Sequence, residues 1–259
     1  SAVIGASVTG VIQNLSTSDL YLSGNNVDFA GGVTIKSGEV ALLTDADAAG
    51  TGTITIGDSS GSANATLTLN DTLGFANAIS IASGNTGIAT ISAGTSANST
   101  YSGAITLNSH DLYFQTLGNA RDINLSSNIT GTGNIVINNT GAGTVTLSGA
   151  SINNTGTITN NGSTTDLTII SGVVGTNVTG VVQNSATSQL TLSGANTFTS
   201  GLTIQEGTVA LATSTSAGGG SGTGTITIGD TTGSATATLK GDGRTFANPI
   251  VLATGTTGT

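Results

Sequence analysis

The single histidine of the chain is the first residue that could carry chemistry. His110 stands in "NSHDLYF", directly before Asp111 and close to Tyr113 and Phe114. A histidine near a carboxylate can act as a general base or as a metal ligand around neutral pH. The chain has no second histidine, and no Ser-His-Asp arrangement is suggested. The sequence therefore favours the plainer interpretation, an ordinary histidine in a loop.

Carboxylates raise the question of a calcium site. Asp45 and Asp47 in "LLTDADAAG" form the closest acidic pair, and Asp58 and Asp230 recur in "TIGD". Calcium takes six to eight oxygen ligands. The nine-residue calcium-binding repeat is absent, and the later counterpart of "LLTDADAAG", "LATSTSAGGG", has no acid. We interpret these acids as solvated loop residues and predict neither a metal site nor a cofactor.

Cleavage of an acidic polysaccharide would need clustered carboxylates with a basic partner on one face. Arg121 beside Asp122, and Arg244 near Asp242, are isolated pairs. We therefore predict that the chain is not an enzyme. The alternative is a carbohydrate-binding or carbohydrate-cleaving protein, in which a groove would be lined by scattered carboxylates and three tyrosines, namely Tyr21, Tyr101 and Tyr113.

Composition narrows the class of protein further. The 259 residues include 40 glycines and no cysteine, and the net charge is −9. Without cysteine there is no disulfide framework and no thiolate metal site. Four basic residues cannot line a phosphate-binding stripe, so nucleic acid is not an expected partner. No apolar run reaches the ~18 residues of a membrane span, so direct membrane insertion is not expected.

The elements that must position these residues are short strands. Thr-rich segments such as "TITI", "TLTL" and "TVTL" alternate with a period of two, which is typical of half-buried strands. Strands recur about every 10–12 residues between Gly and Asn corners, the spacing of an all-β solenoid, sandwich or barrel. We predict an all-β parallel β-helix. With coils of roughly 20 residues it would have on the order of a dozen turns and form an elongated rod of ~60 Å.

Asn pairs mark several of the predicted corners. They occur at Asn138–Asn139, Asn153–Asn154 and Asn160–Asn161. Two interpretations stay open: amide ladders between successive coils, or simple turn residues.

Internal repetition supports the solenoid. Residues 3–87 match residues 173–258 at an offset of about 170, and residues 88–172 complete the unit. We expect residues 1–259 to be one continuous β-helix and about one and a half units of a longer array.

The segment "LTLSGANTFTSGLTIQEGTVAL" (190–211) resembles the passenger-associated β-strand repeat of autotransporter proteins. The residues that carry the resemblance are Leu192, Gly194, Asn196, Thr197, Phe198, Gly201, Thr203, Ile204, Gly207, Val209 and Leu211. The earlier copy keeps Gly24, Asn26, Phe29, Gly32, Thr34, Ile35, Gly38, Val40 and Leu42, but has one inserted residue. The strict motif covers about a fifth of the chain. In each copy we expect the segment to form about one coil.

That resemblance implies a right-handed parallel β-helix and an exported bacterial protein. We expect a non-catalytic stalk segment of a cell-surface or secreted adhesin-like passenger, or a module of a surface fibre. The expected partners are neighbouring repeats, a second copy stacked end to end, and surface glycans or a host or neighbouring cell surface. The start of the chain, "SAVIGASVTG", shows no signal peptide, so export rests on the resemblance.

Overall fold

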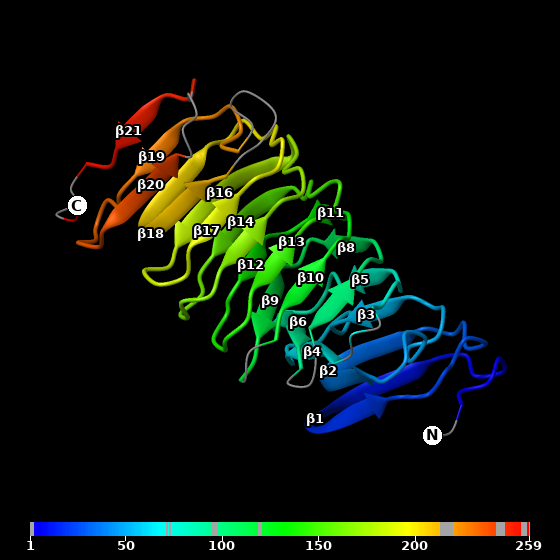
Figure 1. Ribbon diagram of the computed structural model, residues 1–259. Helices are drawn as coiled ribbons and strands as arrows, with labels where there is room; N and C mark the ends of the chain where they lie inside the picture. The colour runs from blue at the N-terminus through cyan, green and yellow to red at the C-terminus, as the bar shows by residue number, and fades with distance from the viewer. Residues whose placement is uncertain are drawn as a thin grey trace.

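The computed structural model is an elongated rod of stacked parallel strands, with the two termini at opposite ends (Figure 1). It describes residues 3–70, 72, 74–94, 98–118, 121–212, 220–241, 247–254 and 258. The described residues contain no α-helix, and so none of them forms a helix that could cross a membrane. Each strand pairs in parallel with strands one coil before and after it. The predicted all-β parallel β-helix is therefore confirmed.

The strands stack into three columns, which we name faces A, B and C. Face A holds the first parts of β1 (Val11–Leu22) and β2 (Val33–Leu43), followed by β3 (Ile54–Ile56), β5 (Ile79–Ile81), β8 (Ile105–Asn108) and β11 (Ile129–Thr132). It continues through single bridges from Ile129 to Ile152 and from Ile152 to Val174.

Face B is the longest column. It holds the second parts of β1 and β2, the first part of β18 (Leu202–Leu211), and β4 (Ala65–Asn70), β6 (Ala89–Ala93), β9 (Leu112–Thr116), β12 (Ile135–Ile137), β14 (Gly156–Asn160), β16 (Val178–Asn184), β19 (Ile226–Ile228) and β21 (Ile250–Leu252).

Face C begins with a bridge between Phe75 and Tyr101. It holds the second part of β18 and β7 (Ser99–Tyr101), β10 (Ile123–Leu125), β13 (Val145–Leu147), β15 (Thr168–Ile170), β17 (Leu190–Leu192) and β20 (Ala237–Gly241).

The coils are longer and fewer than the sequence suggested. On face B, seven successive pairings join Val40 to Ile204, 164 positions later, which is about 23 residues per coil. The ten spacings between the eleven rungs of this face give roughly 48 Å at about 4.8 Å each. This average is somewhat longer than the expected value of roughly 20 residues, and the corner loops vary widely in length: Leu211 lies 19 positions after its partner Leu192 and 30 before its partner Gly241.

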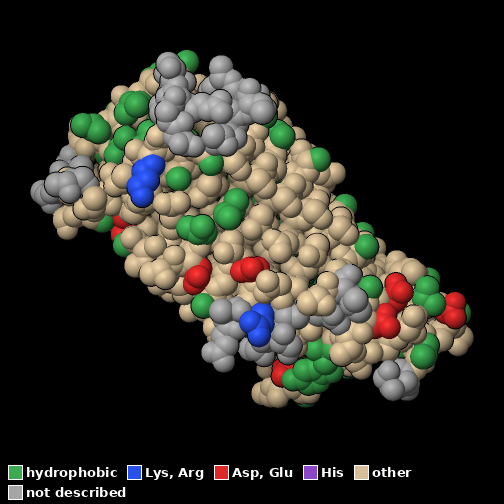
Figure 2. Space-filling view, in the orientation of Figure 1, with side chains coloured by type: hydrophobic (Ala, Val, Ile, Leu, Met, Phe, Trp, Pro, Cys, Tyr) green, Lys and Arg blue, Asp and Glu red, His purple; other side chains and the backbone are tan. Residues whose placement is uncertain are grey.

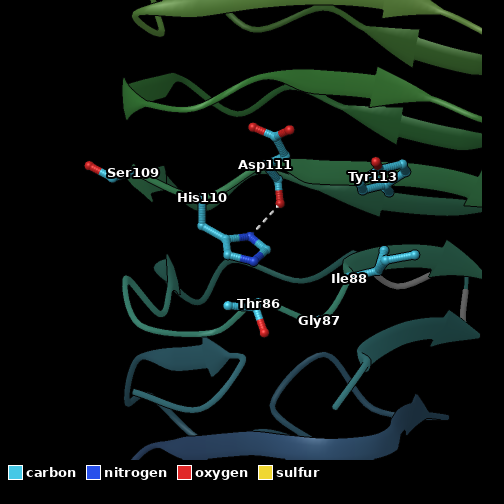
Figure 3. Close-up of a pocket in the computed structure, with 7 residues that line it drawn as sticks. All are labelled: Thr86, Gly87, Ile88, Ser109, His110, Asp111 and Tyr113. Carbon is cyan, nitrogen blue, oxygen red and sulfur yellow. Dashed lines mark hydrogen bonds between the residues drawn. The ribbon is translucent and has the colours of Figure 1, made fainter. Parts of the chain in front are cut away.

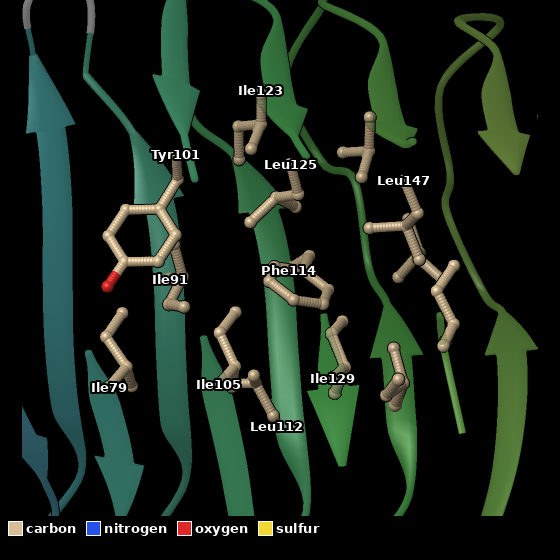
Figure 4. Packing of buried hydrophobic residues seen from close by; sticks show 14 of the residues in the cluster. Ile79, Ile91, Tyr101, Ile105, Leu112, Phe114, Ile123, Leu125, Ile129 and Leu147 are labelled. Carbon is tan, nitrogen blue, oxygen red and sulfur yellow. The ribbon is translucent and has the colours of Figure 1, made fainter. Parts of the chain in front are cut away.

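Aliphatic rows fill the interior. In each short strand the outer two residues point inward and the middle one outward; Ile54 and Ile56 are fully buried, whereas Thr55 is half-exposed. Successive coils place Ile, Leu and Val above one another, and Figure 4 shows these rows converging from the faces. Fully burying one such side chain stabilises the fold by about 1.5–3 kcal/mol. Each coil therefore covers the apolar surface of the coil before it.

Two neighbouring interior positions of face B are amides. Asn160 and Gln183 stand in a row with Ile137 and Ile204 and are buried. The amide of Asn160 donates to Gln183 Oε1 at 2.8 Å and accepts from the Thr168 hydroxyl at 2.9 Å. The Gln183 amide donates to backbone carbonyls at the following corner. Because the polar atoms of both amides are paired, the pair avoids the cost of burying unpaired polar atoms.

Candidate functional site

The repeat motif forms one complete coil in each copy, as its length predicted. Leu190 pairs with Val209 across one turn, and Leu20 pairs with Val40 in the earlier copy. The buried apolar residues of the motif are Leu192, Phe198, Ile204, Val209 and Leu211, with Phe29, Ile35, Val40 and Leu42 in the earlier copy. Thr34 and Thr203 face outward and are half-exposed.

The motif asparagines join three successive coils. Asn196 accepts a hydrogen bond from Val174 N at 2.8 Å, one coil before, and its amide donates to Gly220 O at 2.8 Å, one coil after. Asn26 repeats this geometry, with Ile4 N at 2.8 Å and Ala48 O at 2.7 Å. Both side chains are buried. Each amide therefore satisfies a backbone group on either side of its own coil.

The motif phenylalanines are covered by glycines that the sequence analysis did not single out. Phe198 and Phe29 are fully buried, and Gly222 and Gly50 of the next coil lie directly against them. A Cβ on Gly222 would stand 2.5 Å from Phe198 O and 3.0 Å from two ring carbons, and the φ of Gly222 is +65°. The sequence could have revealed these glycines, because the segment "GTGTITIGD", which begins with Gly50 or Gly222, follows the phenylalanine in both copies.

The motif glycines allow sharp corners and close approach between coils. Gly32, Gly38, Gly201 and Gly207 have positive φ. A Cβ on Gly207 would stand 1.9 Å from Ser185 O. Gly194 has the same kind of contact, with Gly172 O at 2.0 Å from its added Cβ, and Gly24 is buried.

The predicted asparagine ladders are short. Asn184 donates to Asn161 Oδ1 at 2.9 Å, and Asn160 donates to Gln183. Asn139 and Asn154 instead bond to backbone atoms at corners. Both interpretations of the Asn pairs therefore apply, each to different residues.

His110 lines an open hollow of about 320 Å³ between two corner loops (Figure 3). Its ring points toward Thr86 and Gly87 of the preceding coil. The ring Nδ1 lies 2.8 Å from the backbone oxygen of Asp111. Tyr113 stands at the other end of the hollow.

His110 and Asp111 do not form a catalytic pair. The Asp111 carboxylate points away from the ring and accepts hydrogen bonds from Asn134 N at 2.8 Å and Asn134 Nδ2 at 3.2 Å, in the next coil. What faces the hollow is one imidazole with nearby hydroxyls. Such a hollow can hydrogen-bond a small polar ligand, but its described lining residues include no aligned nucleophile and base.

Asp45 and Asp58, singled out as candidate calcium ligands, have local structural contacts. Asp45 Oδ1 accepts a hydrogen bond from Asp47 N at 2.9 Å, which closes a turn. Asp58 pairs with Lys36 at 3.3 Å. Within the described ranges, no three His, Cys, Asp or Glu side chains gather where a metal ion could be held. Figure 2 shows acids concentrated toward the N-terminal end and isolated basic side chains.

The three tyrosines do not line one groove. Tyr21 is exposed near the N-terminal end, and Tyr113 is half-exposed near the middle of the rod. Tyr101 is fully buried, its hydroxyl donates to Asn77 O, and burial raises the pKa of its phenol. Asp122 accepts hydrogen bonds from Thr144 N and Asn98 Nδ2, whereas Asp242 and Arg244 lie outside the described residues.

Comparison of the chain with known protein families, curated proteins and solved structures finds no match.

Proposed function

We propose that this chain is a rigid, non-catalytic stalk segment of an exported bacterial surface protein, either an adhesin-like passenger or a module of a surface fibre. The observation that carries the proposal is the unbroken stack of eleven rungs on face B around a largely apolar interior. A rod of this kind lengthens by adding coils. Because every coil packs on its neighbours, the rod can hold a domain at a fixed distance from its other end. The resemblance of the 190–211 segment to the autotransporter passenger repeat supports export and surface display.

Surface accessibility tests this role. Antibodies raised against the chain should label intact cells of the source organism as strongly as permeabilised cells. Brief protease treatment of intact cells should remove the signal, while a cytoplasmic marker protein survives. Labelling that requires permeabilisation would exclude a surface stalk.

A second candidate, carbohydrate binding, is favoured by the hollow around His110. A half-exposed aromatic ring at one end of the hollow, an imidazole at the other end and the hydroxyls of the lining can contact the apolar and polar sides of a sugar. A glycan array should then show saturable binding that is lost in the His110→Ala/Tyr113→Ala variant. The Tyr21→Ala variant is a matched control, because Tyr21 lies far from this hollow near the N-terminal end.

A further inference from the structure

Equivalent strands of the internal repeat lie on different faces of the rod. Ile35 stacks between Gln13 and Ile56 on face A. Its repeat equivalent, Ile204, stacks between Gln183 and Ile228 on face B.

The following strand is displaced in the same way. Val40 stacks between Leu20 and Leu67 on face B, whereas its equivalent Val209 stacks between Leu190 and Leu239 on face C. The stacking partners are themselves repeat equivalents. The local arrangement is therefore kept while the whole motif moves round the rod by one face.

The coil count explains this displacement. Seven pairings lead from Val40 to Ile204 along face B. Ile204 is equivalent not to Val40 but to Ile35, which lies one face earlier in the chain. One unit of about 170 residues is thus seven coils plus one face rather than a whole number of coils.

The displacement carries four identical outward residues with it, although Asp58 pairs with Lys36 in the first copy and the repeat equivalent of Lys36 is Gln205. We define the corner patch as Thr53, Thr55, Asp58 and Ser62 in the first copy and Thr225, Thr227, Asp230 and Ser234 in the second. Equivalent members have the same degree of exposure: the first and last are exposed and the middle two half-exposed. The first patch lies at the corner between faces A and B, and the second at the corner between faces B and C.

We infer that the repeat presents its corner patch on a different side of the rod in each successive unit. This geometry belongs to the chain itself and does not depend on the proposed stalk role.

Gold labelling tests the inference directly, because the chain contains no cysteine. The Ser62→Cys/Ser234→Cys variant is coupled to maleimide gold clusters and imaged as single rods by electron microscopy. We expect the two clusters to be separated by seven rungs, roughly 34 Å along the axis, and to lie on different sides of the rod axis in most views.

The matched control is Ile12→Cys/Thr130→Cys, two outward positions joined by five pairings along face A. These clusters should align parallel to the axis in every view. A second test pair, Thr53→Cys/Thr225→Cys, should repeat the result for Ser62 and Ser234. Alignment of either test pair parallel to the axis, as in the control, would overturn the inference.

Discussion

At the scale of single residues, buried amides hold successive coils in register. Asn196 bonds one backbone N–H and one backbone C=O that lie on different coils, and neither group belongs to a regular strand pairing. A side chain that satisfies two such groups also fixes the spacing of three coils. The same role for Asn26 explains why the motif keeps asparagine at this corner in both copies.

Replacing Asn196 with alanine should destabilise the chain by about 2–6 kcal/mol, since it leaves two buried backbone groups unpaired and each costs about 1–3 kcal/mol. Chemical denaturation followed by far-ultraviolet circular dichroism measures this change. Asn177→Ala is the control, because Asn177 is exposed on a neighbouring corner. Equal denaturation midpoints for the two variants would contradict the bridging role of Asn196.

Tyr101 makes stability depend on pH in the alkaline range. Burial raises the pKa of its phenol in the folded state above the ordinary value of 10.0. The unfolded chain therefore loses this proton at lower pH than the folded chain. The stabilisation is fully present below about pH 10 and declines as the pH rises further. Tyr101→Phe should lower the free energy of unfolding by about 1 kcal/mol at neutral pH, because the hydrogen bond is lost. The same variant should show a shallower decline of stability above pH 10. A decline in the Tyr101→Phe chain identical to that of the parent chain would show that another group titrates.

At the scale of the coil, close contact between the motif phenylalanine and the next coil requires glycine. Gly222→Ala should destabilise the chain by several kcal/mol, because alanine is strained at φ +65° and its Cβ would clash with the Phe198 carbonyl and ring. Gly180→Ala is the matched control: its Cβ would meet nothing closer than 3.8 Å, and alanine reduces the entropy of the unfolded chain. Thermal unfolding of both variants measures the difference. If the Gly222→Ala chain has the same unfolding temperature as the parent chain, the contact between Gly222 and Phe198 is looser than described.

The strands themselves could be predicted from the sequence, whereas their places around the rod could not. A period of two in "TITI" and "TVTL" is enough to assign β3 and β13, and Gly and Asn mark the corners. The face that each strand occupies depends on the summed lengths of all earlier corners. Since successive coils differ by up to 11 residues near Leu211, no average coil length could show that Ile35 and Ile204 lie on different faces.

The interior could also be predicted only in part. Alternation predicts that Asn160 and Gln183 occupy inward positions, but polarity alone would place them outside. They are tolerated because Asn160 donates to Gln183 on the adjacent rung, while Thr168 donates to Asn160 and the Gln183 amide donates to corner carbonyls. The hollow at His110 forms where two loops of successive coils lie side by side. The local sequence around His110 does not indicate which loop lies next to it.

At the scale of the whole molecule, stability comes from neighbouring coils only, so a rung without a neighbour presents a surface like those buried within the rod. At the last described strand, β21, the register places Ile250 and Leu252 over the inward residues Ile226 and Ile228. Ile250 is nevertheless 52% exposed and Leu252 70% exposed. An uncovered strand with apolar inward residues is a template for further parallel pairing. We therefore predict that this chain associates end to end.

Ile250→Lys/Leu252→Lys should weaken that association by at least about tenfold, because covering the end would bury two unpaired ammonium groups, and tenfold corresponds to only about 1.4 kcal/mol. Sedimentation velocity over a range of concentrations measures the association. The control is Val251→Lys, which adds a charge on the same strand at an outward position beside Thr227 and should leave stacking intact. If the parent chain sediments as a monomer at every concentration, end-to-end stacking does not occur. If Val251→Lys weakens association as much as the double variant, the contact is lateral, because only a lateral contact would cover the outward face of β21.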